Sequence, residues 1–288
     1  MPTTEENCLV KDMTSIKGLG ILAGGGDLPF ILLESCEELG IEPFVIAFDG
    51  HTDKELTDGR EHIWTRLGAV GSILKTLNNR GIKDLCLIGA IRRPSLAELS
   101  PDLKAAAFFS KAGSELLGDD GLLKALKVFL EEEGFTLHGA HEFAGSLLCP
   151  AGVIGKFKPT KGDYDDISRG IGVLEGMSDL DIGQAVIVQE GLVLGVEAVE
   201  GTDELIKRCA SLRRKGRGGV LVKLCKTGQA RDLDLPTIGP RTIELLASYG
   251  FAGAAFHAGQ SLLIKKQEVA QIADKNKIFV IGLPPHSA

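Results

Sequence analysis

The sequence has no apolar run long enough to cross a membrane and few aromatic residues, with 1 tryptophan and 2 tyrosines in 288 residues. A transmembrane helix needs roughly 18 consecutive apolar residues. Positive charge is also scarce, because 32 lysines and arginines face 39 aspartates and glutamates, for a net charge of −7. Nucleic-acid binding depends on clustered positive charge, so this balance argues against a DNA or RNA partner. The acidic start, where a signal peptide would be basic, predicts a cytoplasmic protein with residues 1–16 as a leader.

Several sequence patterns of catalytic and metal-binding proteins are missing. No C-x-x-C pair occurs, and no histidine spacing typical of a zinc site is present. The G-x-S-x-G pattern of serine hydrolases is absent as well. We therefore expect reduced, mostly buried thiols. The six cysteines are Cys8, Cys36, Cys86, Cys149, Cys209 and Cys225.

The length predicts two α/β domains. In the first half, strand-like and helix-like segments alternate, which is typical of βαβ units around a parallel sheet. Residues 17–146 are therefore expected to form a Rossmann-like domain, and Trp64 to lie in its core. The proline- and glycine-containing residues 147–161 are expected to be a linker. The strands expected in the first half cover residues 18–23, 43–48, 84–91 and 135–139, and the helices cover 28–39, 69–79, 103–113 and 122–133.

Residues 162–288 are expected to form a mixed α/β domain. Two apolar segments separated by Glu190 and Gly191 predict an antiparallel hairpin. Thr202 or Asp203 is expected to cap the helix that follows. The strands expected here cover residues 185–189, 192–199, 219–224, 254–256, 262–264 and 278–281, and the helices cover 165–175, 202–214, 240–249 and 267–273.

The first candidate site is the glycine-rich turn between the first predicted strand and helix. Gly24, Gly25 and Gly26 would let backbone N–H groups approach a phosphate at the helix start, next to Asp27. Pro29 stands where the dinucleotide-binding pattern has its third glycine, which weakens that match. The alternative is a tight turn without a ligand.

A second candidate is the acidic pair Asp119-Asp120, before an amphipathic helix. One aspartate at a helix start is an ordinary cap. The second supplies a carboxylate that capping does not need, so a ligand-binding role and a purely helical role both stay open.

The richest segment lies in the second half. Glu197 interrupts an apolar strand, where an unpaired carboxylate is costly, and Lys223 in another predicted strand is the expected partner. The run Glu200-Gly201-Thr202-Asp203 adds oxygen ligands, and the loop 226–236 carries both cations and carboxylates. Carboxylates with lysines are the groups that a Mg²⁺-assisted phosphoryl site needs. The alternative for each residue alone is a weak surface ion pair.

From about Gly18 to Leu283, the sequence resembles the UDP-2,3-diacylglucosamine pyrophosphatases of the LpxI type. The most specific part is Lys223-x-x-Lys226-x-Gly228-Gln229 with the run 234–239 (DLPTIG) after it. The other landmarks are the turn 23–29, Gly118-Asp119-Asp120, Asp181-Ile182-Gly183-Gln184 and Glu200-Gly201-Thr202-Asp203.

The resemblance implies hydrolysis of UDP-2,3-diacylglucosamine to UMP and 2,3-diacylglucosamine 1-phosphate, with Mg²⁺ and water attack on phosphorus. It also implies a substrate that resides in the inner membrane, hence peripheral contact with lipid. Lys223, Asp234 and position 230 are the expected catalytic residues, and Glu200, Asp234 and position 230 the expected metal ligands. The expected substrate-binding residues are Gly24, Gly25, Gly26, Asp27, Asp119, Asp120, Gln184, Glu200, Gly201, Thr202, Asp203, Lys226 and Gln229.

One position departs from the family pattern. Ala230 stands where the family has an aspartate, and a methyl group neither binds Mg²⁺ nor accepts a proton. We interpret this chain as an aspartate-to-alanine variant with reduced hydrolysis and retained substrate binding. A natural member that uses Asp232 or Asp234 instead is the alternative. Two other functions also stay open: a non-catalytic nucleotide-sugar or lipid-binding protein, and a nicotinamide-dependent oxidoreductase that uses Asp49.

Overall fold

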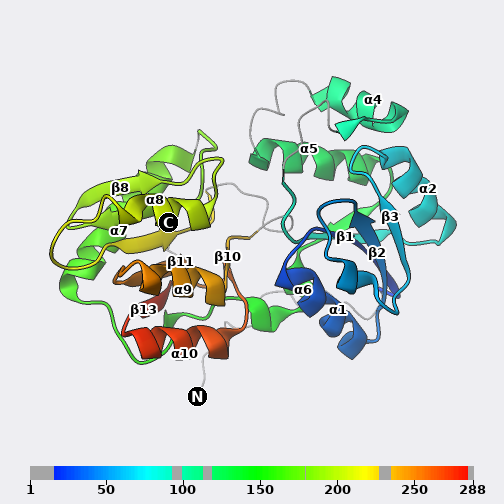
Figure 1. Cartoon of the computed structure of the whole chain (residues 1–288). Coiled ribbons are helices and arrows are strands. Elements are labelled where there is room, and N and C mark those ends of the chain that lie inside the picture. Colours follow the sequence, from blue (N-terminus) through cyan, green and yellow to red (C-terminus); the bar gives the residue numbers. More distant parts are fainter. Residues whose placement is uncertain (1–15, 93–98, 113–118, 179, 227–234, 285–288) are drawn as a thin grey trace, which may run out of the picture. The chain divides into compact units, whose positions relative to one another are not determined.

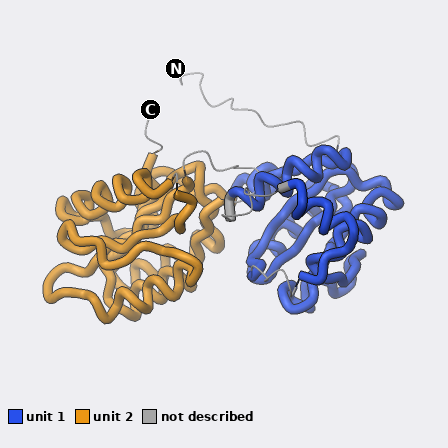
Figure 2. Tube along the Cα trace, turned by 90° about the horizontal axis from the view of Figure 1, so that it is seen from above, with its two compact units in different colours: residues 1–146, 230–234 blue, residues 147–229, 235–288 orange. Residues whose placement is uncertain are grey.

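The computed structural model describes residues 16–92, 99–112, 119–178, 180–226 and 235–284. The described chain forms two compact units, one up to residue 146 and one from residue 147 (Figures 1 and 2). The predicted leader lies outside the described residues except for Ile16, which is buried in the first core. Among the described helices, none is long and apolar enough to span a bilayer.

The first unit is built on five parallel strands in the order β3-β2-β1-β4-β5. The strands are β1 (Gly18–Ala23), β2 (Glu42–Phe48), β3 (His62–Thr65), β4 (Asp84–Ile88) and β5 (Thr136–His138). The helices are α1 (Asp27–Leu39), α2 (Val70–Asn79), α4 (Leu103–Ala112), α5 (Asp119–Glu132) and α6 (Ala140–Phe143), with the 3-10 turns η2 (Lys54–Thr57) and η4 (Gly145–Leu147).

Helices cover both faces of this sheet (Figure 1). On one face, Leu32 of α1 and Phe143 of α6 pack against β1 and β4. On the other face, Leu77 of α2 and Leu130 of α5 pack against Phe44 and its neighbours. Apolar burial on both faces explains why the strands are almost continuously hydrophobic. The predicted Rossmann-like class of the first half is confirmed.

The edge strand β3 was not expected from the sequence, and the prediction that Trp64 lies in the core is wrong. β3 pairs only with β2, and its residues alternate between exposed and half-buried positions. Trp64 is 37% exposed. An edge strand of four residues with polar neighbours has too weak a pattern to distinguish it from a loop.

The second unit contains a six-stranded mixed sheet in the order β6-β13-β11-β9-β7-β8, and a two-stranded ladder of β10 with β12. The strands are β6 (Gly152–Val153), β7 (Ala185–Gln189), β8 (Leu192–Val196), β9 (Val220–Lys223), β10 (Thr237–Ile238), β11 (Gly253–His257), β12 (Leu262–Leu263) and β13 (Phe279–Leu283). The helices are α7 (Lys161–Ser178), α8 (Thr202–Ala210), α9 (Pro240–Ser248) and α10 (Lys266–Asn276).

Helix α7 covers one face of the mixed sheet through Ile167 and Leu174. Helices α8, α9 and α10 cover the other, through Leu205, Leu246 and Val269. The expected hairpin is present, because β7 and β8 are antiparallel and joined at Glu190-Gly191. The mixed α/β class predicted for this half is confirmed.

Residues 147–161, expected to be a linker, pack onto the second unit instead. Cys149 and Ile154 are buried in its core. Within this segment, β6 pairs with β13 in antiparallel fashion. The segment is therefore a partly buried connection, which its apolar residues Cys149 and Ile154 fix to the second unit.

The parallel strands β9, β11 and β13 end at the same edge of the second sheet. Lys223 is the last residue of β9 and His257 the last of β11. Ligands of open α/β sheets lie beyond the carboxyl ends of the strands. This edge of the second unit is therefore where a site is expected.

Candidate active site

Lys223 ends β9 with its ammonium group buried at this edge. The residue is 8% exposed. Its Nζ donates to the hydroxyl of Thr202 at 3.0 Å and to the backbone carbonyl of Thr237 at 3.3 Å. A buried ammonium is tolerated only with such oxygen partners. Lys223, expected to be catalytic, is therefore held by two oxygens from different elements.

Glu197, which follows β8, supplies the negative charge of this cluster. It is 5% exposed. Its Oε1 accepts the hydroxyl proton of Thr202 at 2.5 Å, and its Oε2 accepts the backbone N–H of Gln184 at 2.9 Å. Lys223 was expected to contact this carboxylate directly. Instead, the Thr202 hydroxyl lies between the two charged groups and bonds to both.

A glycine allows the loop before β7 to approach Glu197. At Gly183, φ is +52°, and a Cβ built there would lie 2.0 Å from the carbonyl oxygen of Glu197. No side chain fits this position. The next residue, Gln184, contributes its backbone to the site, because its N–H binds Glu197 and its carbonyl accepts the N–H of Leu224 at 2.9 Å.

Lys226 is the second lysine of the cluster. Its Nζ contacts Oδ1 of Asp181 at 2.5 Å, and both side chains are mostly buried. Asp181 was recognised only as part of a motif, without a role. The fold therefore brings three separated motifs together: the run 181–184, the run 200–203 and the lysines of β9 and the residues after it.

The predicted capping of α8 by Thr202 or Asp203 is wrong. Gly201 is the N-cap residue, with φ +80°, and no side chain caps the helix. Thr202 is the first helical residue, and its hydroxyl binds Glu197 instead. The hydrogen bond to the buried carboxylate of Glu197 outweighs the capping preference. Asp203 forms an ion pair with Arg241, Oδ2 to Nε, at 2.7 Å.

Glu200 is engaged outside the Lys223 cluster. One of its carboxylate oxygens lies 2.6 Å from Nη2 of Arg208, and the other accepts the N–H of Ala198 at 3.1 Å. Partial desolvation opposes ionisation, but these hydrogen bonds and the arginine charge outweigh it and lower the pKa of Glu200 below its ordinary value. In this conformation, Glu200 neutralises Arg208, and its expected role as a metal ligand stays a prediction.

The glycine turn of the first unit has its N–H groups bonded within the unit. Gly24 donates to the carbonyl of Ile88 at 2.8 Å, and Gly25 to that of Ala90 at 2.9 Å. The N–H of Gly26 donates to Oδ2 of Asp53 at 2.9 Å. Sequence reasoning missed Asp53, which places a carboxylate at the start of α1, where a phosphate was expected. In this conformation the turn fits the alternative without a ligand, and phosphate binding there stays a prediction.

Other predicted site residues fall outside the described part. Gln229, Ala230 and Asp234 are not described, nor are the side chains of Asp119 and Asp120 at the start of α5. Asp27 is described as the first residue of α1. Roles at these six positions stay predictions.

Two family models match this chain along nearly its whole length. The LpxI N-terminal domain matches residues 18–147, and the LpxI C-terminal domain matches residues 150–281. This chain belongs to the LpxI family. A curated relative, the UDP-2,3-diacylglucosamine pyrophosphatase LpxI of Caulobacter vibrioides, is 37% identical over 277 residues, which cover 94% of this chain and 99% of the relative.

Solved structures give weaker matches. The enzyme WbmG of Bordetella bronchiseptica, in complex with NAD, aligns over 40% of this chain and 34% of its own, with 18% identity and a TM-score of 0.26. Glycinamide-RNase-transformylase T of Mycobacterium tuberculosis aligns over 63% of this chain and 43% of its own, with 13% identity and a TM-score of 0.26. Both scores are too low to bear on the function of the LpxI chain.

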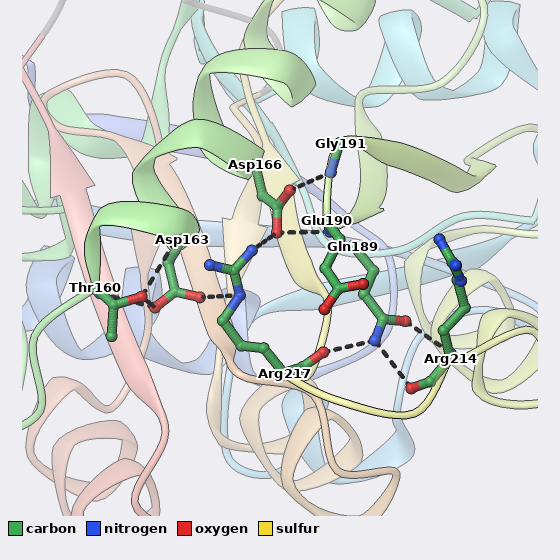
Figure 3. Close-up of polar contacts among 8 residues, drawn as sticks. All are labelled: Thr160, Asp163, Asp166, Gln189, Glu190, Gly191, Arg214 and Arg217. Atoms are coloured by element: carbon green, nitrogen blue, oxygen red, sulfur yellow. Dashed lines mark hydrogen bonds and ion pairs between the residues drawn. The ribbon is translucent and has the colours of Figure 1, made fainter.

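The LpxI C-terminal domain also contains a second buried polar network, at the opposite end of its sheet (Figure 3). Asp166 of α7 accepts the N–H groups of Glu190 and Gly191 and contacts Arg217, Oδ2 to Nη2, at 2.5 Å. Gln189 donates to the carbonyls of Arg214 and Arg217. These groups bind the hairpin and the loop before β9 to each other, so we assign them to folding.

The described carboxylates of the LpxI site do not form a metal centre by themselves. Within the described ranges, no three histidine, cysteine, aspartate or glutamate side chains gather as a metal ion requires. Asp181, Glu197 and Glu200 are bonded to Lys226, Thr202 and Arg208 respectively. Metal binding by Glu200, Asp234 and position 230 stays a prediction, and the last two lie outside the described residues.

Proposed function

We propose that this chain is a UDP-2,3-diacylglucosamine pyrophosphatase that releases UMP and 2,3-diacylglucosamine 1-phosphate, in the biosynthesis of lipid A. The observation that carries the proposal is the relative with this activity, aligned over 94% of the chain. A buried lysine at the carboxyl edge of the second sheet supports it, because a diphosphate needs cations that are already in place.

Lys223 and Lys226 supply the cationic groups. Thr202 and Thr237 direct two N–H bonds of the Lys223 ammonium, so among the described contacts a third N–H is left for a phosphate oxygen. Lys226 is held by Asp181 nearby. Cations fixed before the substrate arrives stabilise charge that develops on phosphate oxygens without reorganising in the reaction.

Mg²⁺ stays part of the proposal as a prediction. Glu200, Asp234 and an aspartate at position 230 are the residues that would hold it. Bound Mg²⁺ would neutralise the diphosphate and orient it. In the Ala230→Asp variant, we expect EDTA to abolish UMP release, and we expect Mg²⁺ but not Ca²⁺ to restore it. Undiminished release in EDTA would rule the metal out.

The experiment that tests the function compares this chain with its Ala230→Asp variant. We expect the variant to release UMP from UDP-2,3-diacylglucosamine at least ~100-fold faster, because it restores a metal-binding carboxylate. Calorimetry of this chain with the same substrate should detect binding. Equal rates would refute the role of position 230, and no hydrolysis by either protein would refute the proposed activity. Fluorescence titration with NADH tests the oxidoreductase alternative.

Contact with a lipid bilayer is the finer part of the proposal. The two loops that carry Gln184 and Glu197 also expose Leu180 (65% exposed), Ile182 (42%) and Val199, whose side chain is fully exposed. Exposed apolar residues gathered beside a site are typical of lipid or protein contacts. The acidic net charge opposes binding to anionic lipid, so we assign the contact to these apolar side chains.

Flotation with phosphatidylcholine vesicles tests this surface. We expect the double variant Ile182→Glu, Val199→Glu to bind vesicles at least ~100-fold more weakly, because two apolar side chains that enter the bilayer together contribute ~3 kcal/mol. The matched control is Leu212→Glu. Leu212 is 50% exposed in the same unit but follows α8 at the other end of the sheet. Equal loss in both proteins would contradict the assignment.

A further inference from the structure

The carboxylate of Glu197 has no assigned role in the reaction, yet it is among the most buried charged groups of the second unit. It is 5% exposed, at the end of an otherwise apolar strand. Burying an ionised carboxylate costs several kcal/mol unless hydrogen bonds compensate. A residue with folding as its only purpose could be apolar here. We therefore look to the hydrogen-bond partners of Glu197 to explain why a buried carboxylate stands at this position.

One of these partners, Thr202, connects Glu197 to Lys223. The hydroxyl of Thr202 has one proton, which it donates to Oε1 of Glu197 at 2.5 Å. Its oxygen is then turned to accept from the Lys223 ammonium at 3.0 Å. Because an ionised carboxylate only accepts hydrogen bonds, Glu197 fixes the direction of both bonds in this chain of three groups.

The other contacts of Glu197 fix the carboxylate itself. Its Oε2 accepts the N–H of Gln184, and its backbone N–H pairs with the carbonyl of Ala185. The glycine at 183 lets this loop approach. A charged group held at both oxygens cannot rotate away when a ligand binds to the lysine.

We propose that Glu197 is a positioning residue, which acts through Thr202 to orient the Lys223 ammonium for a phosphate oxygen of the substrate. The carboxylate touches neither substrate nor metal. It sets the hydroxyl rotamer and supplies the opposite charge that keeps the buried ammonium in one place. The kinetic part of this inference rests on the proposed function, and its structural part stands by itself.

The structural test observes the lysine directly. In ¹⁵N spectra that select lysine ammonium groups, Lys223 should give a slowly exchanging signal, assigned by its loss in Lys223→Met. We expect Glu197→Gln and Thr202→Val to broaden this signal beyond detection, with the rest of the spectrum retained. An unchanged signal in both variants, or no such signal in the parent chain, would overturn the proposal.

The matched control removes a different buried carboxylate of the same unit. Asp166 is 1% exposed and belongs to the polar network at the opposite end of the sheet (Figure 3). Asp166→Asn should lower stability without altering the Lys223 signal. Equal loss of the signal in Asp166→Asn and Glu197→Gln would mean that any buried charge has this effect, and would overturn the assignment.

The kinetic test is a double-mutant cycle in the Ala230→Asp background. We expect Glu197→Gln to lower kcat ~10–100-fold with less than ~3-fold change in KM. In the Lys223→Met background, the same substitution should cost less than ~2-fold, because the group through which it acts is gone. Independent losses that multiply would overturn the positioning role. If the background protein shows no hydrolysis, the proposed function fails, while the ammonium signal still decides the positioning.

Discussion

The carboxylate of Asp166 on α7 accepts the backbone N–H of Gly191 at 2.7 Å, so a helix holds the turn of the β7–β8 hairpin (Figure 3). The turn has positive φ at both central residues, +51° at Glu190 and +78° at Gly191. This is the type I′ geometry that suits the twist of a tight hairpin. The second N–H of the turn binds the same carboxylate, and the Arg217 guanidinium neutralises it.

We expect Asp166→Ala to lower the free energy of unfolding by ~2–4 kcal/mol, since it leaves two buried N–H groups without their acceptor and removes one of the two carboxylates that face the Arg217 guanidinium. Urea unfolding followed by circular dichroism measures this. Asp165→Ala, at the exposed neighbouring position of the same helix, is the control and should change stability by less than ~0.5 kcal/mol. Similar losses in both variants would contradict the role of Asp166.

Gly183 is expected to be intolerant of any side chain. Gly183→Ala adds a Cβ 2.0 Å from the carbonyl oxygen of Glu197 at a residue with φ +52°. We expect the free energy of unfolding, measured by urea unfolding, to fall by ~2 kcal/mol or more. Lower UMP release in the Ala230→Asp background should accompany it, because the loop would move Gln184 away from Glu197.

The control for this variant is a glycine at which an added Cβ meets no other atom. Gly172 lies in the exposed part of α7, and a Cβ there meets no atom within 4 Å. Gly172→Ala should raise stability by ~0.5–1 kcal/mol, because alanine restricts the unfolded chain and favours helix. A Gly183→Ala variant as stable as Gly172→Ala would show that the loop adapts.

The sequence predicted elements best where local signals and packing agree. The helix α1 ends where it was expected, because Gly40 adopts the left-handed conformation and its N–H bonds back to Glu37. Thr202 shows the opposite case. Its position favoured a helix cap, but its hydroxyl donates instead to the buried carboxylate of Glu197, which follows the preceding strand β8. Charged residues in two apolar strands predicted that Glu197 and Lys223 are partners. That the Thr202 hydroxyl lies between them could be learned only from the fold.

The thiols provide a test of burial. Cys36, Cys86, Cys149 and Cys209 are buried, and Cys225 is partly buried. Desolvation raises the pKa of Cys36 to about 12 and that of Cys149 to about 11, so neither forms much thiolate at neutral pH. With Ellman's reagent at pH 8, we expect these four thiols to react only after unfolding in urea. Fast reaction of more than two of the six in the native protein would contradict the buried cores.

Glu200 makes the stability of the second unit depend on acid pH. Hydrogen bonds and Arg208 lower its pKa in the folded state. A carboxyl group with a lowered folded pKa contributes stability above its ordinary value of 4.5, and that contribution is lost as pH falls through the folded pKa. The side chain is 26% exposed, so solvent screens the pair with Arg208 and the effect is small.

Glu200→Gln removes this titration, which gives the expected sign. The parent should be more stable than the variant at pH 6, with a difference that stays constant down to about pH 5. Below the ordinary pKa of 4.5 the difference should shrink, because protonation gives the parent the same neutral side chain. Thermal unfolding of both proteins from pH 6 to pH 3 measures it. A difference that grows toward low pH would mean that the folded structure favours the protonated form, in conflict with the contacts to Ala198 and Arg208.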